Sequence, residues 1–399
     1  MLGSFNLDKT YQYLLIALAF LLPLTVFGGN LIIVIIVILW LISGDYKSKF
    51  NEIINTKLLL ASILFFCLHV IGLFWTEDLN WGFHIVHKMW YFLLLYPILY
   101  NIVKRKDIEL YIFAFLLAIS ITEITSYLIW FEVISPLKHA TAFNPTPFMS
   151  HISYNPILAF ATYLVLHKVL LNKSLGNFQL FLYSFFAISM SINMFITGGR
   201  AGQVMYFIML GILCFQYFNY NKVKGLFAAL IIIPVVFFSA YQTSTMFNER
   251  MDRAYDNITN YSERKGTSVG LRISFTINSW EIIKQNPFIG IGTGDFPGEY
   301  KKINMINTPG LPDTANPHNM YILVLAQLGF LGLVSLLSIF YYQIKFSFYA
   351  SNRFISDVGF TLPALFLVIM WSDSYLLGHF TTLMFIFFSS FLHNNFEKF

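Results

Sequence analysis

Long apolar runs follow one another through most of the chain, and short polar segments separate them. A helix that crosses the hydrocarbon core of a bilayer takes about 17–25 residues. The apolar pattern therefore predicts an all-α polytopic membrane protein with about twelve transmembrane helices. The predicted spans are 11–27, 30–43, 57–75, 85–103, 108–130, 152–171, 178–197, 201–219, 225–243, 318–341, 355–372 and 375–393. The second of them is short for a complete crossing.

One long polar segment, 244–317, interrupts this series between the ninth and tenth predicted spans. Within it, apolar residues near helical spacing predict a helix over 268–285, with Ser268 as its cap. Asn286 and Pro287 end that pattern, and the glycines of 290–294 predict a flexible turn. We therefore expect a single domain over 1–399 that contains one large, partly helical loop. The loop is rich in cations: Arg250, Arg253, Arg264, Lys265, Arg272, Lys284, Lys301 and Lys302.

The positive charges of the short loops predict which side of the membrane each loop faces. Loops that follow even-numbered spans carry most of the Lys and Arg, from Lys47 after the second span to Lys398 at the end. Loops on the other face offer only Lys88, Lys138 and Arg200. Because short cytoplasmic loops are enriched in Lys and Arg, both termini are expected in the cytoplasm. The segment 244–317 is then external.

The composition agrees with a membrane location. The chain is 57% hydrophobic and only 11% charged, with a mean hydropathy of +0.65, whereas soluble domains carry roughly 25% charged residues. The lipid bilayer is therefore an expected partner, and no nucleic acid is. Cys67 and Cys214 both lie in apolar runs, which argues against a disulfide framework.

Two external arginines are candidates for binding an anion. Arg200 follows two glycines between adjacent spans, on the face where cytoplasmic anchoring does not explain it. Its planar fork of donors matches a diphosphate, although a lipid phosphate is the alternative partner. Arg272 falls in the first turn of the predicted helix 268–285, where the helix dipole disfavours a cation and favours an anion. The alternative is an ordinary surface arginine.

His318 follows Asn316-Pro317 and opens the tenth predicted span. The positive end of a helix dipole favours a neutral imidazole, which can accept a proton from a hydroxyl group. His318 is therefore a candidate general base. The alternative is an interfacial histidine that only forms hydrogen bonds.

Three further external residues are candidate substrate contacts. Lys88 is a possible phosphate ligand, His151 heads the sixth predicted span, and Asp373 is a membrane carboxylate suited to orienting an arginine or a sugar. His84 and His87 have helical spacing, but they lack a third metal ligand. The loop acids show no metal-ligand pattern either, so we expect no metal and no cofactor. These acids are Asp295, Glu299 and Asp313.

Three motifs and the predicted topology resemble the O-antigen ligase and polymerase superfamily of bacterial inner membranes. The likeness covers about residues 190 to 335 in motifs and the whole chain in topology. Gly199 stands where relatives often have serine. The motifs are Thr197-Gly198-Gly199-Arg200-Ala201-Gly202, then Gly270-Leu271-Arg272 through Trp280 to Asn286-Pro287-Phe288-Ile289-Gly290-Ile291-Gly292, and Asn316-Pro317-His318-Asn319-Met320-Tyr321 with Gln327-Leu328-Gly329-Phe330-Leu331-Gly332.

The resemblance implies a membrane fold similar to the C-type glycosyltransferases and an O-antigen ligase activity. Such an enzyme transfers a glycan from an undecaprenyl diphosphate donor to a sugar hydroxyl of a lipid A–core acceptor, at the periplasmic face of the inner membrane. It is expected to be a metal-independent, inverting glycosyltransferase. The resemblance implies catalytic roles for Arg200, Arg272 and His318. The candidate substrate-binding residues are Lys88, His151, Arg264, Lys265, Asn319, Tyr321 and Asp373.

Other functions remain open at this point. An O-antigen polymerase or an O-linked protein oligosaccharyltransferase of the same superfamily would share these motifs. A transporter of a lipid-linked anion belongs to a different class, and it would favour charged residues near the bilayer midplane. Glu123 is the one obvious acid in the middle of a predicted span, so the sequence favours the enzyme.

Overall fold

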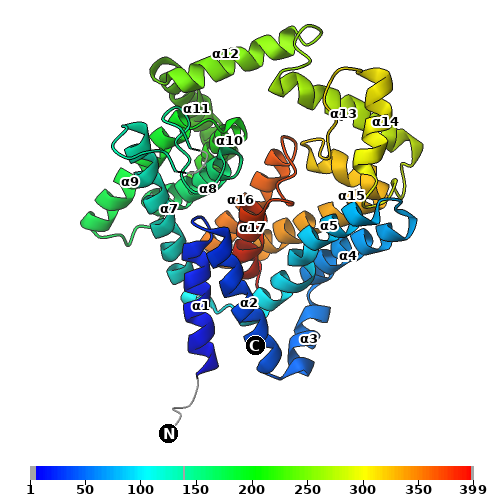
Figure 1. Cartoon of the computed structure of the whole chain (residues 1–399). Coiled ribbons are helices and arrows are strands. Elements are labelled where there is room, and N and C mark those ends of the chain that lie inside the picture. The colour runs from blue at the N-terminus through cyan, green and yellow to red at the C-terminus, as the bar shows by residue number, and fades with distance from the viewer. Residues whose placement is uncertain (1–5, 138–139, 397–399) are drawn as a thin grey trace. The chain divides into compact units, whose positions relative to one another are not determined.

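The computed structural model describes residues 6–137 and 140–396. Within those ranges the chain is helical and contains no strand, apart from an isolated β-bridge between Thr141 and Asn144 (Figure 1). Lys138 and Lys398, which contributed to the charge pattern, lie outside the described residues. The all-α prediction is thus confirmed for the described part of the chain.

The α-helices and short helical turns follow one another in this order: α1 (Leu7–Leu21), α2 (Val26–Ile42), α3 (Tyr46–Asn55), α4 (Lys57–Ile71), η1 (Gly72–Trp75), α5 (Leu79–Trp90), η2 (Tyr91–Leu95), α6 (Tyr96–Ile102), η3 (Arg105–Asp107), α7 (Ile108–Trp130), α8 (His151–Leu171), α9 (Asn177–Ile196), α10 (Arg200–Tyr217), α11 (Lys222–Thr243), α12 (Thr245–Thr259), α13 (Ser268–Gln285), α14 (Phe296–Asn307), α15 (Met320–Tyr349), α16 (Arg353–Ile369) and α17 (His379–Leu392).

Six helical segments of the described chain are long and apolar enough to cross a membrane, and a seventh is added if α2 and α3, bent by 114°, form one span. The protein is therefore a multi-pass membrane protein. Each of the twelve predicted segments overlaps a helix, although the fourth begins earlier, at Leu79. Twelve crossings remain a prediction. The six segments are Lys57–Trp75, Arg105–Trp130, His151–Leu171, Asn177–Ile196, Lys222–Thr243 and Met320–Tyr349.

Internal contacts divide the chain into two compact units. The first unit comprises Met1–Val34 and Lys104–Asp252, and the second comprises Ile35–Val103 and Arg253–Phe399. In the first unit α8 packs against α9 and α10. Of the apolar window in α8, 78% is buried, compared with 11% in α11. Thus α8 is the interior helix of this unit, and α11 presents its side chains to the surroundings.

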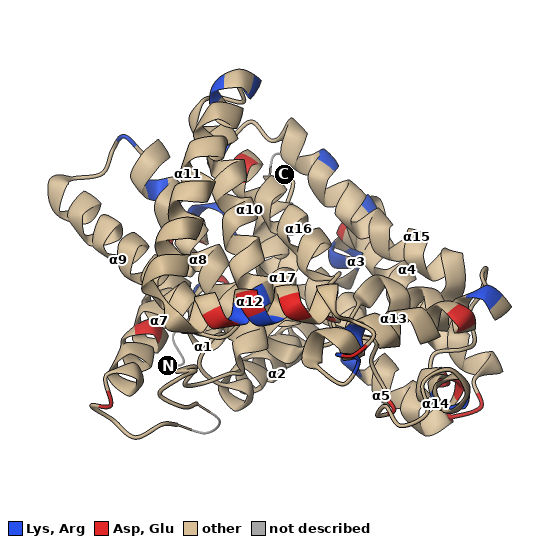
Figure 2. Ribbon diagram, turned by 90° about the horizontal axis from the view of Figure 1, so that it is seen from above, with Lys and Arg blue, Asp and Glu red and all other residues tan. Residues whose placement is uncertain are grey.

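The charge content distinguishes the apolar helices from the helices of the polar segment. Figure 2 shows both signs of charge along α12, whereas α9 contains no charged residue. A helix without charges suits a lipid environment, because an unpaired charge in the hydrocarbon region is costly. A helix such as α12, with both signs, suits a polar boundary instead.

Helix α15 of the second unit contains a break, to which another segment of the chain is hydrogen-bonded. Gly329 has non-helical angles (φ 61°, ψ −158°) inside this helix. At the break, the amides of Ile291 and Gly292 donate to the carbonyls of residues 326 and 327, at 2.9 and 3.0 Å. The amides of residues 330 and 331 in turn donate to the carbonyls of Pro287 and Phe288, at 2.8 and 3.2 Å. The segment 287–292 thus occupies backbone groups that the broken helix leaves unpaired.

Two glycines permit this close approach. A Cβ atom on Gly290 would lie 2.3 Å from the backbone of Gln327, and one on Gly329 would lie 2.3 Å from the backbone of Phe288. Both glycines also have positive φ angles, which residues with a side chain rarely adopt. The second and third sequence motifs are therefore the two halves of one backbone contact.

The predicted flexible turn at 290–294 is instead firmly anchored, so that prediction is wrong. The Thr293 hydroxyl donates to the carbonyl of His69 at 2.7 Å, and the Gln327 amide donates to the carbonyl of Thr293 at 2.6 Å. Next to the turn, the buried carboxylate of Asp295 accepts hydrogen bonds from the amides of Glu77 and Asp78, at 2.9 and 2.8 Å. His69 lies in α4, and Glu77 and Asp78 follow η1. This part of the chain therefore holds the turn in place.

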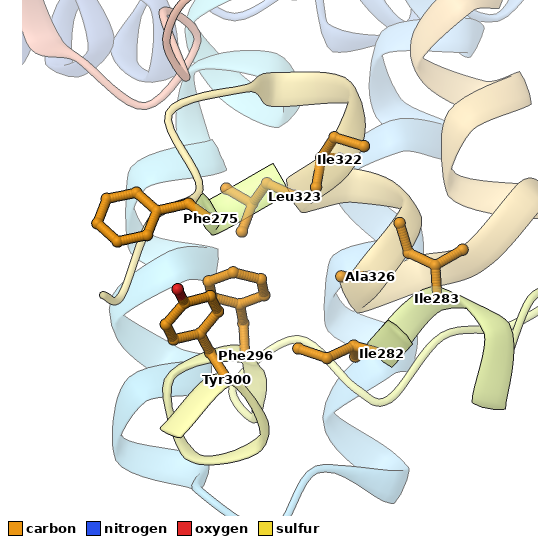
Figure 3. Packing of buried hydrophobic residues seen from close by; sticks show 8 residues of the cluster. All are labelled: Phe275, Ile282, Ile283, Phe296, Tyr300, Ile322, Leu323 and Ala326. Atoms are coloured by element: carbon orange, nitrogen blue, oxygen red, sulfur yellow. The ribbon is translucent and has the colours of Figure 1, made fainter. Parts of the chain in front are cut away.

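Helices α13 and α14 pack on the first turns of α15. The predicted helix 268–285 is confirmed as α13, which ends before Asn286 as expected. Its N-cap is Thr267, whose side chain accepts from the amide of Gly270, and not Ser268. Figure 3 shows the buried cluster between the three helices, formed by Phe275, Ile282, Ile283, Phe296, Tyr300, Ile322, Leu323 and Ala326.

We predict that Gly329→Ala and Gly290→Ala each lower the thermal stability of the detergent-solubilised protein. The added methyl group meets the opposite backbone at a φ that disfavours alanine, so the loss should be at least about 2 kcal/mol. Gly298→Ala is the matched control, because a Cβ there meets nothing within 4 Å. Equal melting temperatures for all three variants would contradict the proposed role of the backbone contact.

Candidate active site

His318 lies immediately before α15 and not within it. The helix begins at Met320, and Asn319 caps it by accepting from the amides of Tyr321 and Ile322, at 3.0 and 3.1 Å. His318 itself has a positive φ of 53°, and its amide donates to the side-chain oxygen of Asn316 at 2.9 Å. His318 was expected to be the first residue of this helix, but the helix begins two residues later. The tight turn before the helix determines where its imidazole lies.

The imidazole of His318 contacts the carboxylate of Asp373. Its Nδ1 lies 3.2 Å from both carboxylate oxygens. A carboxylate only accepts hydrogen bonds, so this contact assigns the proton to Nδ1 and makes Nε2 the acceptor atom of the neutral ring. The side chain of His318 is 34% exposed and that of Asp373 is 12% exposed. The pair therefore combines a buried acid with a histidine that external groups can reach.

Arg272 approaches the same carboxylate. One of its terminal nitrogens lies 3.8 Å from Oδ2 of Asp373, and its side chain is 42% exposed. Burial alone would raise the pKa of Asp373. The hydrogen bond and charge of His318, the Ser374 amide and the charge of Arg272 outweigh burial and lower this pKa. Asp373 is accordingly an ionised carboxylate between two cationic or proton-carrying groups.

Two further contacts orient the imidazole. The ring of Phe275, one helical turn after Arg272 on α13, stacks on the ring of His318 with a centroid distance of 6.1 Å and an interplanar angle of 22°. The side-chain oxygen of Asn316 accepts from the hydroxyl of Ser374 at 2.8 Å as well as from the amide of His318. Thus α13 and the turn after α16 both hold the histidine in position.

The third predicted catalytic residue, Arg200, lies in the first unit as the first residue of α10. The preceding turn packs against Asn155 of α8, whose side-chain nitrogen donates to the hydroxyl of Thr197 at 2.9 Å. A Cβ on Gly199 or on Gly202 would lie 2.5 or 2.3 Å from atoms of Asn155. The glycines therefore allow the start of α10 to approach α8 closely. The structure brings Arg272 and His318 together in the second unit.

His151 takes part in the surroundings of the same turn in the first unit. Its Nδ1 lies 3.1 Å from the side-chain nitrogen of Asn144, and the Asn144 oxygen accepts from the amide of Gly198 at 2.9 Å. Because the amide group of Asn144 donates to His151, the imidazole Nδ1 acts as an acceptor there. The proton of neutral His151 is then on Nε2, which is the opposite tautomer from that of His318.

The other predicted binding residues have contacts of their own. Arg264 pairs with Asp256 at 3.2 Å, and Lys265 lies over the ring of Tyr261 at 5.9 Å. Lys88 is half-buried in the last turn of α5.

Asn319 and Tyr321 hold the start of α15. Both residues are buried. The Asn319 oxygen is occupied by the cap of the helix, and the Tyr321 hydroxyl donates to the carbonyl of Leu367. These two residues therefore stabilise the site and do not line it with free polar atoms.

Sequence reasoning identified Asp373 as a possible partner of an arginine, but it did not pair this acid with His318, 55 residues earlier. It also missed Phe275, Asn316 and Ser374 as groups that orient the imidazole. The sequence places Asp373 at the end of an apolar run, where an acid needs a partner. The sequence does not identify that partner. In the described parts of the chain, no group of three or more His, Cys, Asp or Glu is arranged to hold a metal ion.

A comparison with protein families matches residues 185–337 to O-antigen ligase. This part of the chain is therefore similar to O-antigen ligase. The matched segment contains Arg200, Arg272 and His318, whereas Asp373 follows it. A comparison with curated proteins finds no match. The contact between His318 and Asp373 therefore links the matched segment to the chain that follows it.

We predict that Asp373→Asn lowers the stability of the detergent-solubilised protein at neutral pH, by about 1–3 kcal/mol for the lost charged hydrogen bonds. The folded-state pKa of Asp373 is lowered, so its contribution is present above the unfolded pKa of about 3.9 and is lost as pH falls through the folded pKa. Melting temperatures of the two proteins should therefore converge in acid.

The control for this measurement is Asp256→Asn, which removes an ion pair with 53% and 42% exposed side chains. Exposed pairs contribute little, so its melting temperature should stay close to that of the parent protein. A difference between Asp373→Asn and the parent that stays constant down to the lowest pH would contradict the assignment.

Proposed function

We propose that this protein is an O-antigen ligase, which transfers a glycan from undecaprenyl diphosphate to a sugar hydroxyl of lipid A–core. The single observation that carries the proposal is the contact of His318 with Asp373, beside Arg272, where both Arg272 and His318 lie in the segment that matches O-antigen ligase. A base and an anion-binding group side by side suit the removal of a proton from an acceptor and the departure of a diphosphate.

In the proposed reaction, Nε2 of His318 takes the proton of the acceptor hydroxyl as its oxygen attacks the anomeric carbon of the donor. The C–O bond to the diphosphate breaks, and the bonding electron pair leaves with the diphosphate. Asp373 stabilises the imidazolium that forms, in the manner of an acid behind a catalytic histidine. Attack opposite the leaving group inverts the anomeric centre, and no step requires a metal.

Arg272 is the proposed clamp for the leaving diphosphate. Its side chain is 42% exposed while it neighbours Asp373, so donors remain accessible for a second anion. We propose a catalytic role for Arg200 as well, because of its resemblance to the family motif. His151, Lys88, Arg264 and Lys265 are proposed contacts for donor or acceptor. Their charges and donors suit phosphate and sugar hydroxyl groups.

For the membrane arrangement we propose twelve crossings within one domain, with both termini in the cytoplasm and the site at the periplasmic face of the inner membrane. The excess of Lys and Arg in alternate short loops supports this orientation. The polar helices α12, α13 and α14 suit the external segment, because they interrupt the series of apolar helices.

We predict that His318→Ala abolishes O-antigen attachment in a complementation assay while the protein still inserts into the membrane. Removal of a general base costs about 10²–10⁴-fold in rate. His84→Ala, at an exposed histidine of α5, is the matched control and should restore attachment fully. Near-normal attachment by the His318 variant would falsify the assignment of the base.

We also predict that Arg272→Lys loses about 10²–10³-fold in rate, because an ammonium group cannot reproduce the planar fork of donors. Lys284→Arg is the converse control on the same helix, at an exposed lysine that pairs with Glu281 at 2.9 Å. The control should retain full activity in the same assay. Equal activity of both variants would make Arg272 a bystander.

Deletion of the gene distinguishes a ligase from a polymerase and from an oligosaccharyltransferase. Loss of a ligase leaves rough lipopolysaccharide and long polymer on the lipid carrier. Loss of a polymerase instead leaves single repeat units attached to lipid A–core. An unchanged lipopolysaccharide ladder with loss of glycan on proteins would indicate an oligosaccharyltransferase and would overturn the ligase proposal.

A further inference from the structure

The turn before α10 is held by two side chains that come from distant parts of the first unit. The amide of Gly198 donates to the side-chain oxygen of Asn144 at 2.9 Å. The carbonyl of Gly198 accepts from a terminal guanidinium nitrogen of Arg250, on α12. Both backbone polar groups of one glycine are thus bonded to side chains, 54 and 52 residues away in sequence.

Arg250 occupies the space that the missing side chain of Gly198 leaves. A Cβ atom at this position would lie 2.6 Å from both Cζ and Nη2 of Arg250. Gly198 has no positive φ, so its backbone angles are accessible to other residues. Glycine is therefore needed at this position for space and not for conformation, and the space is that of a guanidinium group.

The same turn is braced from α8. Asn144, which binds the amide of Gly198, also contacts His151 at the start of that helix. One turn further on, Asn155 donates to the hydroxyl of Thr197. The contacts from Arg250 and from α8 together determine where α10 begins, and its first residue is Arg200.

We propose that Arg250 is a positioning residue, which fixes the Gly198 turn and thereby places Arg200 for the diphosphate of the donor. This inference rests on the proposed function. A charged donor on a backbone carbonyl is among the stronger hydrogen bonds. Small displacements of a binding group cost large factors in rate, about 10²-fold for 1 Å. Arg250 acts through Arg200 and does not itself touch the substrate.

The test uses Arg250→Ala, Gly198→Ala and the double variant, assayed in the full-length protein with a lipid diphosphate-linked glycan as donor. We expect Arg250→Ala to lower kcat/KM for the donor about 10–100-fold, with unchanged dependence on the acceptor. Gly198→Ala alone should also lower kcat/KM, because the added methyl group meets the guanidinium group of Arg250. It should have little further effect once Arg250 is alanine, so the two effects are not additive.

Added guanidinium salt gives a sharper readout. It should restore activity to Arg250→Ala, where residue 198 is still glycine and the space is open. The double variant should not respond, because the alanine methyl group fills that space. Rescue of both variants would show that Arg250 acts directly on the substrate and would overturn the positioning role. Full activity of Arg250→Ala would overturn it as well.

Two controls keep the outcome clear. Arg253→Ala, at an exposed arginine of the same helix, should retain activity. If Arg250→Ala does not fold, Gly198→Ala and Arg250→Lys replace it. Normal activity of both would overturn the proposal, and loss in both supports it. If the parent protein transfers no glycan, the proposed function fails, and the same cycle in melting temperatures still tests the contact of Arg250 with Gly198.

Discussion

The backbone contact between the segment 287–292 and the break in α15 is the constraint on which the second unit depends. A broken helix leaves amides and carbonyls unpaired, and an apolar environment makes such groups costly. The glycine-containing loop satisfies them, and the glycines at 290 and 329 permit the two backbones to meet. Because α13 ends just before this loop and His318 lies two residues before α15, the same contact helps to bring Arg272 and His318 together.

Asp373 then sets the electrostatics of the site. A buried carboxylate requires partners, and here it has the imidazole of His318, the amide of Ser374 and the nearby guanidinium of Arg272. The carboxylate selects the tautomer of the histidine and leaves Nε2 available as an acceptor. The acid and Phe275 thus orient a histidine that would otherwise rotate freely in a turn.

The first unit uses glycine in a different way. Around Arg200, the glycines at 198, 199 and 202 adopt no positive φ, and each instead makes room for a neighbouring side chain. Arg250 fills the space beside the first glycine, and Asn155 fills the space beside the other two. In the second unit, by contrast, Gly290 and Gly329 are needed for both space and backbone angle. The motifs of this chain therefore reflect packing as well as chemistry.

Hydropathy alone determined the helical class, the position of nearly every apolar helix and the helix 268–285, because apolar periodicity reports burial directly. It could not determine that the turn at 290–294 is anchored, since a glycine cluster looks the same whether it is mobile or docked. Nor could it pair His318 with Asp373, or Gly198 with Arg250. These contacts join residues more than 50 positions apart, and only the packing of helices on one another decides which distant side chains meet.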